Sequence, residues 1–549
     1  MKKIVIIVAL VCGAWQQADA QYVSKVWVSD QKDGTYINPI IHADYSDPDV
    51  CAVGDDFYMT ASSFGCTPGL PILHSKDLVN WRLANYALKE IEPTIFFNAP
   101  QHGKGVWAPS IRYHNGEFFI YWGDPDWGIF MVKTKDPLGE WEKPVLVKAG
   151  KGMIDPTPLW DEDGKVYLVH AWAGSRAAFN SVITVCEMNA EGTKVISEPV
   201  LVFDGNDGVN HTIEGPKFYK RNGYYYILAP AGGVVTGWQL ALRSRNVYGP
   251  YESKIVMAQG DTDINGPHQG GWVETCTGES WFINFQDKAM YGRVLHLNPV
   301  KWENDWPVIG EDKDGDGCGE PVKRYKKPDV GRIYPIETPI ESDEFNTRQL
   351  GLQWEWHANY QDTFGFTSDL GYIRIYGHIL SKDFVNFWEV PNLLLQKFPA
   401  EEFTATAKLK VSAKADGQQS GLIVMGWDYG YLGVVKEGDK FILNQVVCKD
   451  AEQRSPETVT HLAELPVSRR FGAGRYPNYE RDIYLQVKVT KGGICYFSYS
   501  LDGRKYTSAG VPFTARQGKW IGAKVGLFST APYGKERGWA DADWFRINK

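Results

Sequence analysis

Three acidic residues stand out because each lies at a similar point of a repeated sequence pattern. Asp47, Asp155 and Glu214 lie seven or eight residues before a turn dipeptide, and a proline follows each acid directly or after one glycine. Trp107 and His268 hold the corresponding place in two further copies of the pattern. If the copies form equivalent strands around one axis, these five side chains converge on a single point.

A cluster of three carboxyl groups would suit glycoside hydrolysis. An inverting glycosidase uses one carboxylate to activate water and one carboxylic acid to protonate the leaving oxygen, with about 6.5–9.5 Å between them. A third carboxylate nearby raises the pKa of the acid through charge repulsion, so that the acid stays protonated near neutral pH. A single acid beside proline is usually a turn residue. Three acids in corresponding places are harder to explain by packing, because enclosing unpaired like charges is costly.

The pattern that carries these residues occurs five times. A turn dipeptide followed by an aromatic, β-rich run begins at residues 54, 115, 163, 222 and 277, so the copies start 61, 48, 59 and 55 residues apart. Asn-Gly and Asp-Gly before such a run are strong hairpin signals. A repeat of about fifty residues built from four strands is one blade of a propeller. We therefore predict an all-β chain with a five-bladed β-propeller over residues 37–322.

The pattern changes after the fifth repeat. Residues 323–339 are charged and contain prolines, which predicts a linker. Residues 340–549 contain β-rich runs separated by glycine turns, among them 403–411, 421–427 and 483–503. This alternation predicts a second domain, an antiparallel β-sandwich.

The segments around the three acids resemble glycoside hydrolase family 43, and the resemblance covers residues 37–310. The motifs that carry it are SDPD (46–49), WAPS (107–110), IDPT (154–157), IEGP (213–216) and HQGGW (268–272). The resemblance implies that Asp47 is the general base, that Asp155 orients the acid and modulates its pKa, and that Glu214 is the general acid. It implies no required cofactor.

Three further residues follow from the resemblance. Trp107 resembles an aromatic wall of the sugar subsite, with ordinary packing as the alternative. His268 resembles a histidine that holds a central water or a structural calcium ion, and a structural histidine is the alternative. Arg293, in the run YGR, resembles an arginine that hydrogen-bonds sugar hydroxyls, and an exposed strand arginine is the alternative. The predicted sandwich resembles the concanavalin-like C-terminal domain of β-xylosidase-like members, which helps to close the pocket, but the sequence does not identify the closing residue.

One acidic run copies part of a calcium-binding loop. Residues 312–317 (DKDGDG) match the first half of an EF-hand loop. The position that should hold a bidentate glutamate is Lys323, and no flanking helices are evident. A solvated acidic turn is therefore favoured over a calcium site.

The first twenty residues have the composition of a secretory signal peptide. Lys2 and Lys3 precede an apolar run at 4–11, and an A-x-A motif ends at Ala20. This predicts cleavage after Ala20 and a secreted or periplasmic protein. Cys12 would permit a lipoprotein anchor, but the residue before it is not the small one expected. The apolar run is too short to cross a bilayer, and no later segment is typical of a transmembrane helix.

Composition excludes several other classes. The chain is 43% hydrophobic and 14% aromatic, which excludes general disorder, and its net charge of −8 argues against nucleic acid or an anionic membrane as partner. Seven cysteines remain after the predicted signal peptide, without C-x-x-C spacing, so neither a disulfide scaffold nor a zinc site is expected. The sequence does not decide whether a single disulfide such as Cys51–Cys66 forms.

The favoured function is exo-acting, inverting release of terminal α-L-arabinofuranose or β-D-xylose from plant hemicellulose or pectin fragments, with a slight preference for arabinofuranose. An endo-arabinanase needs an open groove, which the appended sandwich argues against. Fructan-cleaving enzymes are disfavoured because their nucleophile motif is absent at Asp47. A carbohydrate-binding propeller without catalysis is the alternative of another class, and the presence of all three acids argues against it.

Overall fold

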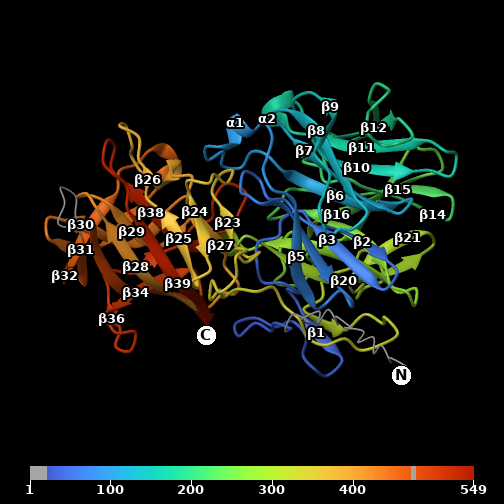
Figure 1. Cartoon of the computed structure of the whole chain (residues 1–549). Helices are drawn as coiled ribbons and strands as arrows, with labels where there is room; N and C mark the ends of the chain where they lie inside the picture. The colour runs from blue at the N-terminus through green and yellow to red at the C-terminus, as the bar shows by residue number, and fades with distance from the viewer. Residues whose placement is uncertain (1–20, 472–477) are drawn as a thin grey trace, which may run out of the picture.

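The computed structural model describes residues 21–471 and 478–549, so the predicted signal peptide lies outside the described residues. Two β-domains lie side by side, a propeller coloured blue to yellow-green and a sandwich coloured yellow-orange to red (Figure 1). The predicted fold, a five-bladed propeller followed by a sandwich, is confirmed. No helix of the described residues is long and apolar enough to cross a membrane.

The propeller consists of five four-stranded antiparallel sheets, each formed by consecutive strands. Blade 1 contains β2 (Asp49–Val53), β3 (Asp56–Thr60), β4 (Gly69–Ser75) and β5 (Trp81–Leu88); blade 2 contains β6 (Trp107–His114), β7 (Glu117–Asp124), β8 (Gly128–Thr134) and β9 (Val145–Ala149); blade 3 contains β10 (Met153–Trp160), β11 (Val166–Trp172), β12 (Val182–Met188) and β13 (Val200–Asp204); blade 4 contains β14 (Lys217–Arg221), β15 (Tyr224–Ala231), β16 (Trp238–Ser244) and β17 (Glu252–Met257); blade 5 contains β18 (His268–Glu274), β19 (Ser280–Asp287), β20 (Arg293–Glu303) and β21 (Trp306–Ile309). Short helices α1 (Thr94–Phe97), α2 (Gly174–Ala177) and η1 (Ala289–Tyr291) lie in the connections.

The turn dipeptides join the first two strands of each blade, as the sequence predicts. Asn115-Gly116 connects β6 to β7, and both residues have positive φ, 48° and 85°. Asn222-Gly223 connects β14 to β15 in the same way, with φ of 51° and 72°. Positive φ at both central residues is the signature of a type I′ turn, which matches the twist of the paired strands.

The N-terminal segment closes the ring by hydrogen bonding to blade 5. The Asn38 side chain accepts a hydrogen bond from Leu297 N at 2.9 Å and donates to Leu297 O and Val322 O, both at 2.8 Å. Just before it, β1 (Thr35–Ile37) pairs with β22 (Arg324–Lys326). Part of the segment predicted as a linker is therefore a strand that fastens both ends of the propeller.

The sandwich consists of two sheets whose facing sides form its core. The first contains β23 (Glu355–Trp356), β26 (His378–Ile379), β27 (Leu394–Lys397), β29 (Gln419–Met425), β30 (Tyr429–Glu437), β31 (Lys440–Cys448), β32 (Thr458–Pro466) and β38 (Lys524–Ala531); the second contains β24 (Gly365–Ser368), β25 (Tyr372–Tyr376), β28 (Phe403–Ala413), β33 (Arg469–Phe471), β34 (Asn478–Thr490), β35 (Ile494–Ser500), β36 (Thr507–Ser508), β37 (Phe513–Thr514) and β39 (Trp539–Asn548). The 3₁₀ helices η2 (Phe387–Glu389) and η3 (Ala451–Gln453) lie in its loops. Alternate residues of β28, from Phe403 to Val411, are buried in this core, as the two-residue period of a strand requires.

Backbone hydrogen bonds join the two domains. Thr67 of the propeller and Trp356 of the sandwich exchange N–H···O bonds of 2.6 and 3.2 Å. The buried Asn359 side chain accepts from Ile91 N at 2.8 Å and donates to Ile91 O at 2.9 Å. Because buried bonds of this kind are costly to leave unmade, the sandwich is held in one position against the propeller.

All seven cysteines of the described residues are free. Cys51 and Cys66, the pair that the sequence left open, are therefore not bridged in this structure.

Candidate active site

The three acids line one cavity of about 310 Å³ on the propeller. Asp47 lies two residues before β2, Asp155 lies within β10, and Glu214 lies three residues before β14. They therefore come from the starts of the innermost strands of three blades. The convergence expected of the three acids and Trp107 is present, whereas His268, the fifth residue expected there, does not line the cavity.

The five positions are not strictly equivalent, contrary to the simple expectation from the repeats. In every blade one residue at the start of the innermost strand has positive φ, and a proline or glycine follows it. These residues are Asp47, Ala108, Asp155, Gly215 and Gln269. Glu214, like Trp107 and His268, lies one residue earlier. Glu214 lies outside its strand, so its side chain reaches the cavity from a different backbone position than the side chains of the two aspartates.

Positive φ at an aspartate is a strained conformation. Asp47 has φ of 56° and Asp155 of 57°. A left-handed conformation costs a non-glycine residue about 1–3 kcal/mol and persists where the surroundings impose it, often at functional sites. The strain at both acids fits a backbone shaped to direct the carboxylates.

Asp47 is surrounded by hydrogen-bond donors. Its Oδ2 accepts from Ser46 Oγ at 2.7 Å and from Ser62 Oγ at 2.6 Å. Its Oδ1 lies 3.2 Å from Nη1 of Arg293. An ionised carboxylate only accepts hydrogen bonds, so this environment suits an ionised Asp47.

Asp155 and Glu214 have the opposite environment. Burial, together with the negative charge of Asp47, raises the pKa of Asp155 to about 7. The Gly215 N–H, which donates a hydrogen bond to Asp155 Oδ2 at 2.7 Å, offsets part of this rise. Although the Glu214 side chain is 36% exposed, desolvation in the cavity and the charges of Asp155 and Asp47 raise its pKa to about 8. The raised pKa favours the protonated form of Glu214, which can donate a proton, whereas Asp47 can accept one.

Replacing Asp155 by asparagine should move the alkaline limb of activity to lower pH. The substitution removes a negative charge that raises the pKa of Glu214, so Glu214 loses its proton at lower pH than in the wild type. The pH profile of kcat/KM measures this pKa in the free enzyme. An alkaline limb that stays in place, or moves to higher pH, would contradict the coupling.

Arg293 and Trp107 also line the cavity. Arg293 begins β20, is buried, and donates from Nη1 to Ser46 Oγ at 2.7 Å as well as contacting Asp47. It is not an exposed strand arginine. Trp107 begins β6, and its Nε1 donates to Gly103 O at 2.9 Å, which fixes the ring in the cavity wall.

His268 lies behind the cavity wall. It is 1% exposed, its Nε2 lies 3.6 Å from Glu214 Oε1, and burial lowers its pKa to about 3. Neither ring nitrogen has a hydrogen-bond partner among the described residues. The next residue, Gln269, lines the cavity instead. The neutral imidazole is thus an available acceptor beside the proposed acid.

Comparison with known proteins agrees with this geometry. The model of glycosyl hydrolases family 43 matches residues 36–307, and that of the β-xylosidase C-terminal concanavalin A-like domain matches residues 342–548. A putative β-xylosidase of Xylanibacter ruminicola is 37% identical over 92% of this chain and 88% of its own length. This chain belongs to glycoside hydrolase family 43. It is a glycosidase.

Other relatives and a solved structure align over most of this glycosidase. A β-xylosidase of Formosa agariphila is 32% identical over 94% of this chain and 90% of its own. A non-reducing end α-L-arabinofuranosidase of Bacteroides ovatus is 31% identical over 76% of this chain and 79% of its own. The crystal structure of a family 43 protein from Bacillus licheniformis superposes with a TM-score of 0.77 at 26% identity, covering 94% of this chain and 99% of that one.

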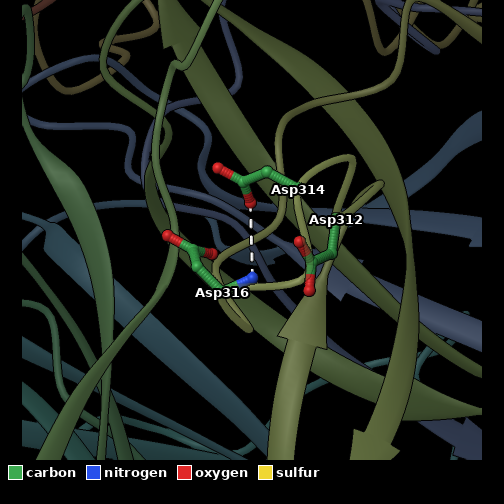
Figure 2. A group of neighbouring side chains, drawn as sticks. All are labelled: Asp312, Asp314 and Asp316. Atoms are coloured by element: carbon green, nitrogen blue, oxygen red, sulfur yellow. Dashed lines mark hydrogen bonds between the residues drawn. The ribbon is translucent and has the colours of Figure 1, made fainter.

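An acidic cluster lies outside the cavity of this family 43 enzyme. The carboxylates of Asp312, Asp314 and Asp316 offer ligand atoms within 4.8 Å of one another (Figure 2). They accept hydrogen bonds from their own loop, for example from Gly315 N to Asp312 at 2.8 Å and from Asp316 N to Asp314 at 3.3 Å. His268 does not belong to any such group among the described residues.

The sandwich contributes a residue that sequence reasoning did not find. Trp520, in the loop between β37 and β38, lines the same cavity. Its ring lies 6.2 Å from that of Trp107, nearly perpendicular to it, and the Arg293 guanidinium lies 5.7 Å above it. Trp520 has φ of 64° and remains 43% exposed, so part of its ring is available for contact with a ligand in the cavity.

Proposed function

We propose that this family 43 enzyme is an exo-acting, inverting glycosidase that releases terminal β-D-xylose from plant xylan-type fragments. The main support for this proposal is that one cavity contains both Asp47, whose carboxylate accepts several hydrogen bonds, and Glu214, whose pKa is raised. Two relatives aligned over more than nine-tenths of the chain are named β-xylosidases, which favours xylose over the arabinofuranose that the sequence slightly preferred. Terminal α-L-arabinofuranose is the second candidate, because the Bacteroides ovatus relative is named for it.

In the proposed reaction Asp47 takes a proton from water while that water attacks the anomeric carbon. Glu214 gives its proton to the leaving oxygen from the other side of the sugar, and Asp155 keeps Glu214 protonated and in place. Arg293 holds Asp47 and lies where sugar hydroxyls would bind. The resulting charges develop inside an enclosed site, where fixed donors act more strongly than in water.

Trp520 supports the proposed exo action. A loop of the sandwich that forms one wall leaves a pocket for a chain end, whereas an endo-acting enzyme needs a groove through which the polysaccharide can pass. The wall combines Trp520 and Trp107 with polar groups, which suits a sugar ring with apolar faces and hydroxyl edges.

Replacing Trp520 by alanine should raise KM about tenfold and change kcat less, because the ring contributes aromatic contact to bound sugar but no proton transfer. Steady-state kinetics with a xylo-oligosaccharide measures both constants. Tyr533→Ala is the matched control, since Tyr533 is an exposed aromatic residue of the sandwich that does not line the cavity. Equal effects in the two variants would argue against a pocket wall at Trp520.

The test of the proposed function is a comparison of aryl β-D-xyloside, aryl α-L-arabinofuranoside and linear arabinan. Turnover of the xyloside with an inverted product, read by NMR, supports the proposal. Faster turnover of the arabinofuranoside selects the second candidate. Internal cleavage of arabinan would indicate an endo-arabinanase, and sugar binding without turnover of any substrate would indicate a carbohydrate-binding propeller.

We also propose that residues 1–20 direct export and are removed after Ala20. N-terminal sequencing of the exported protein should begin at Gln21, and a retained Met1 would contradict the proposal. A structural calcium ion at His268, one of the alternatives that the resemblance offers, remains a prediction and has no part in the proposed reaction.

A further inference from the structure

A buried carboxylate outside the cavity bonds to both domains. Asp44 lies three residues before Asp47, is 5% exposed and does not line the cavity. Its Oδ1 accepts from Arg293 N at 2.8 Å, and its Oδ2 accepts from Gly522 N at 2.9 Å. One carboxylate therefore holds the backbone of the arginine that contacts Asp47 and the sandwich loop that carries Trp520.

The two backbones held by Asp44 are in direct contact. A Cβ on Gly522 would lie 2.7 Å from Gly292 N, and a Cβ on Gly292, where φ is 75°, would lie 2.5 Å from Asp44 Cγ. One residue further, Ala523 N donates to Met290 O at 2.8 Å. The packing leaves no room for a side chain at either glycine, so a displacement of one backbone must move the other.

The hydrogen-bond donors around Asp44 suit a carboxylate in this position. Burial raises the pKa of Asp44 above its ordinary value, and Lys397, Lys524 and the two backbone N–H groups offset only part of that rise. A carboxylate can accept both N–H bonds, one on each oxygen. An asparagine of the same shape has one acceptor oxygen and would place its NH₂ group against one of the two N–H donors. The site therefore distinguishes a carboxylate from its isosteric amide.

We propose that Asp44 is a positioning residue that sets the Trp520 wall against Arg293 and so determines the shape of the sugar pocket. The inference rests on the proposed function, because it assigns a role in that pocket. Trp520 is two residues from Gly522, and the Arg293 side chain follows directly from the backbone that Asp44 holds. A misplacement of about 1 Å at such a distance from the chemistry can cost about 10²-fold in rate.

Asp44→Asn should lower kcat/KM for an aryl xyloside by about tenfold, the size of the loss expected from Trp520→Ala, with a larger change in KM than in kcat. The matched control is Asn359→Asp, another isosteric exchange of a buried residue that makes two backbone hydrogen bonds across the interface. The hydrogen bonds of Asn359 go to Ile91 and Phe97, not to Arg293 or the loop of residues 516–522, so its variant should keep kcat/KM even if its Tm falls. Equal losses of kcat/KM in the two variants would overturn the proposal.

A second measurement does not depend on turnover. Hydrogen exchange followed by mass spectrometry should show faster exchange of residues 516–522 or of the adjoining residues 290–293 in Asp44→Asn, because the Gly522 N–H or the Arg293 N–H loses its acceptor. Exchange of both segments should be unchanged in Asn359→Asp. Unchanged exchange in Asp44→Asn would overturn the inference even if the wild type cleaves xylosides. If the wild type cleaves no glycoside, the proposed function fails while the exchange result still reports on Asp44.

A double-mutant cycle tests whether Asp44 acts through the tryptophan. Once Trp520→Ala has removed the wall, Asp44→Asn should raise KM much less than it does in the wild type. Equal fold-changes in the two backgrounds would overturn the proposal. If Asp44→Asn does not fold, the same tests can be made with Asp44→Ala. The space left by the missing carboxylate can admit water to both N–H groups.

Discussion

Glu214→Ala is expected to lower kcat for a xylo-oligosaccharide by about 10²–10⁴-fold, the usual contribution of a positioned general acid. The natural leaving group is a sugar alkoxide, which needs a proton as the bond breaks. Glu214 can supply that proton at neutral pH because burial and the charges of Asp155 and Asp47 raise its pKa to about 8. Initial rates with purified wild type and variant measure the loss.

The leaving group provides the control for this prediction. A dinitrophenyl xyloside has a leaving group that departs without protonation, so Glu214→Ala should lose far less activity on it than on the oligosaccharide. A merely structural role would reduce both activities by the same factor. An equal loss on the two substrates would therefore contradict the assignment of Glu214 as the acid.

The environments of the acids, rather than their residue types, separate base from acid. Asp47 accepts bonds from two serine hydroxyls and faces Arg293, whereas Glu214 is near other carboxyl groups and the neutral imidazole of His268. Paired carboxyl groups whose surroundings favour different protonation states are what acid–base catalysis needs. The sequence could predict the convergence of the acids, but not these neighbours.

The sequence predicted the blades well because their signals are local. Turn dipeptides and β-rich runs recur at blade length, and the structure places a hairpin at each. The predicted equivalence of the site residues was less accurate. Their spacing from the turn dipeptides varies because the strands contain bulges, as between Ile154 and Thr157. The prolines align the blades better than the turn dipeptides do. Pro48, Pro109, Pro156 and Pro216 each follow the positive-φ residue of their blade.

The parts of the pocket that the sequence did not reveal depend on domain docking. Asp44 and Gly522 are 478 residues apart in the chain, and neither lies in a motif that predicts a partner. Trp520 lies in a sandwich loop whose sequence contains no repeat or spacing signal. Contacts of this kind follow from how two folded domains fit together, so only the three-dimensional structure reveals them.

Asp47→Ala is expected to reduce kcat by about 10²–10⁴-fold, because water is no longer deprotonated as it attacks. The fold should persist: Ser62 keeps its bond from Ala108 N at 2.7 Å, and Arg293 keeps its backbone bond to Asp44. The variant leaves a small space beside the cationic Arg293 on the side from which water would attack. Kinetics and Tm of the purified variant check both statements.

Azide separates the proposed base from a residue that only shapes the site. In Asp47→Ala this small anion should enter the vacated space near Arg293, attack the anomeric carbon without needing a base, and yield a xylosyl azide of inverted configuration, identified by NMR. Asp47→Asn is the matched control: it is equally unable to take a proton but fills the space, so azide should not restore its turnover. Near-normal activity of Asp47→Asn, or an azide product of retained configuration, would show that Asp47 is not the residue that activates water.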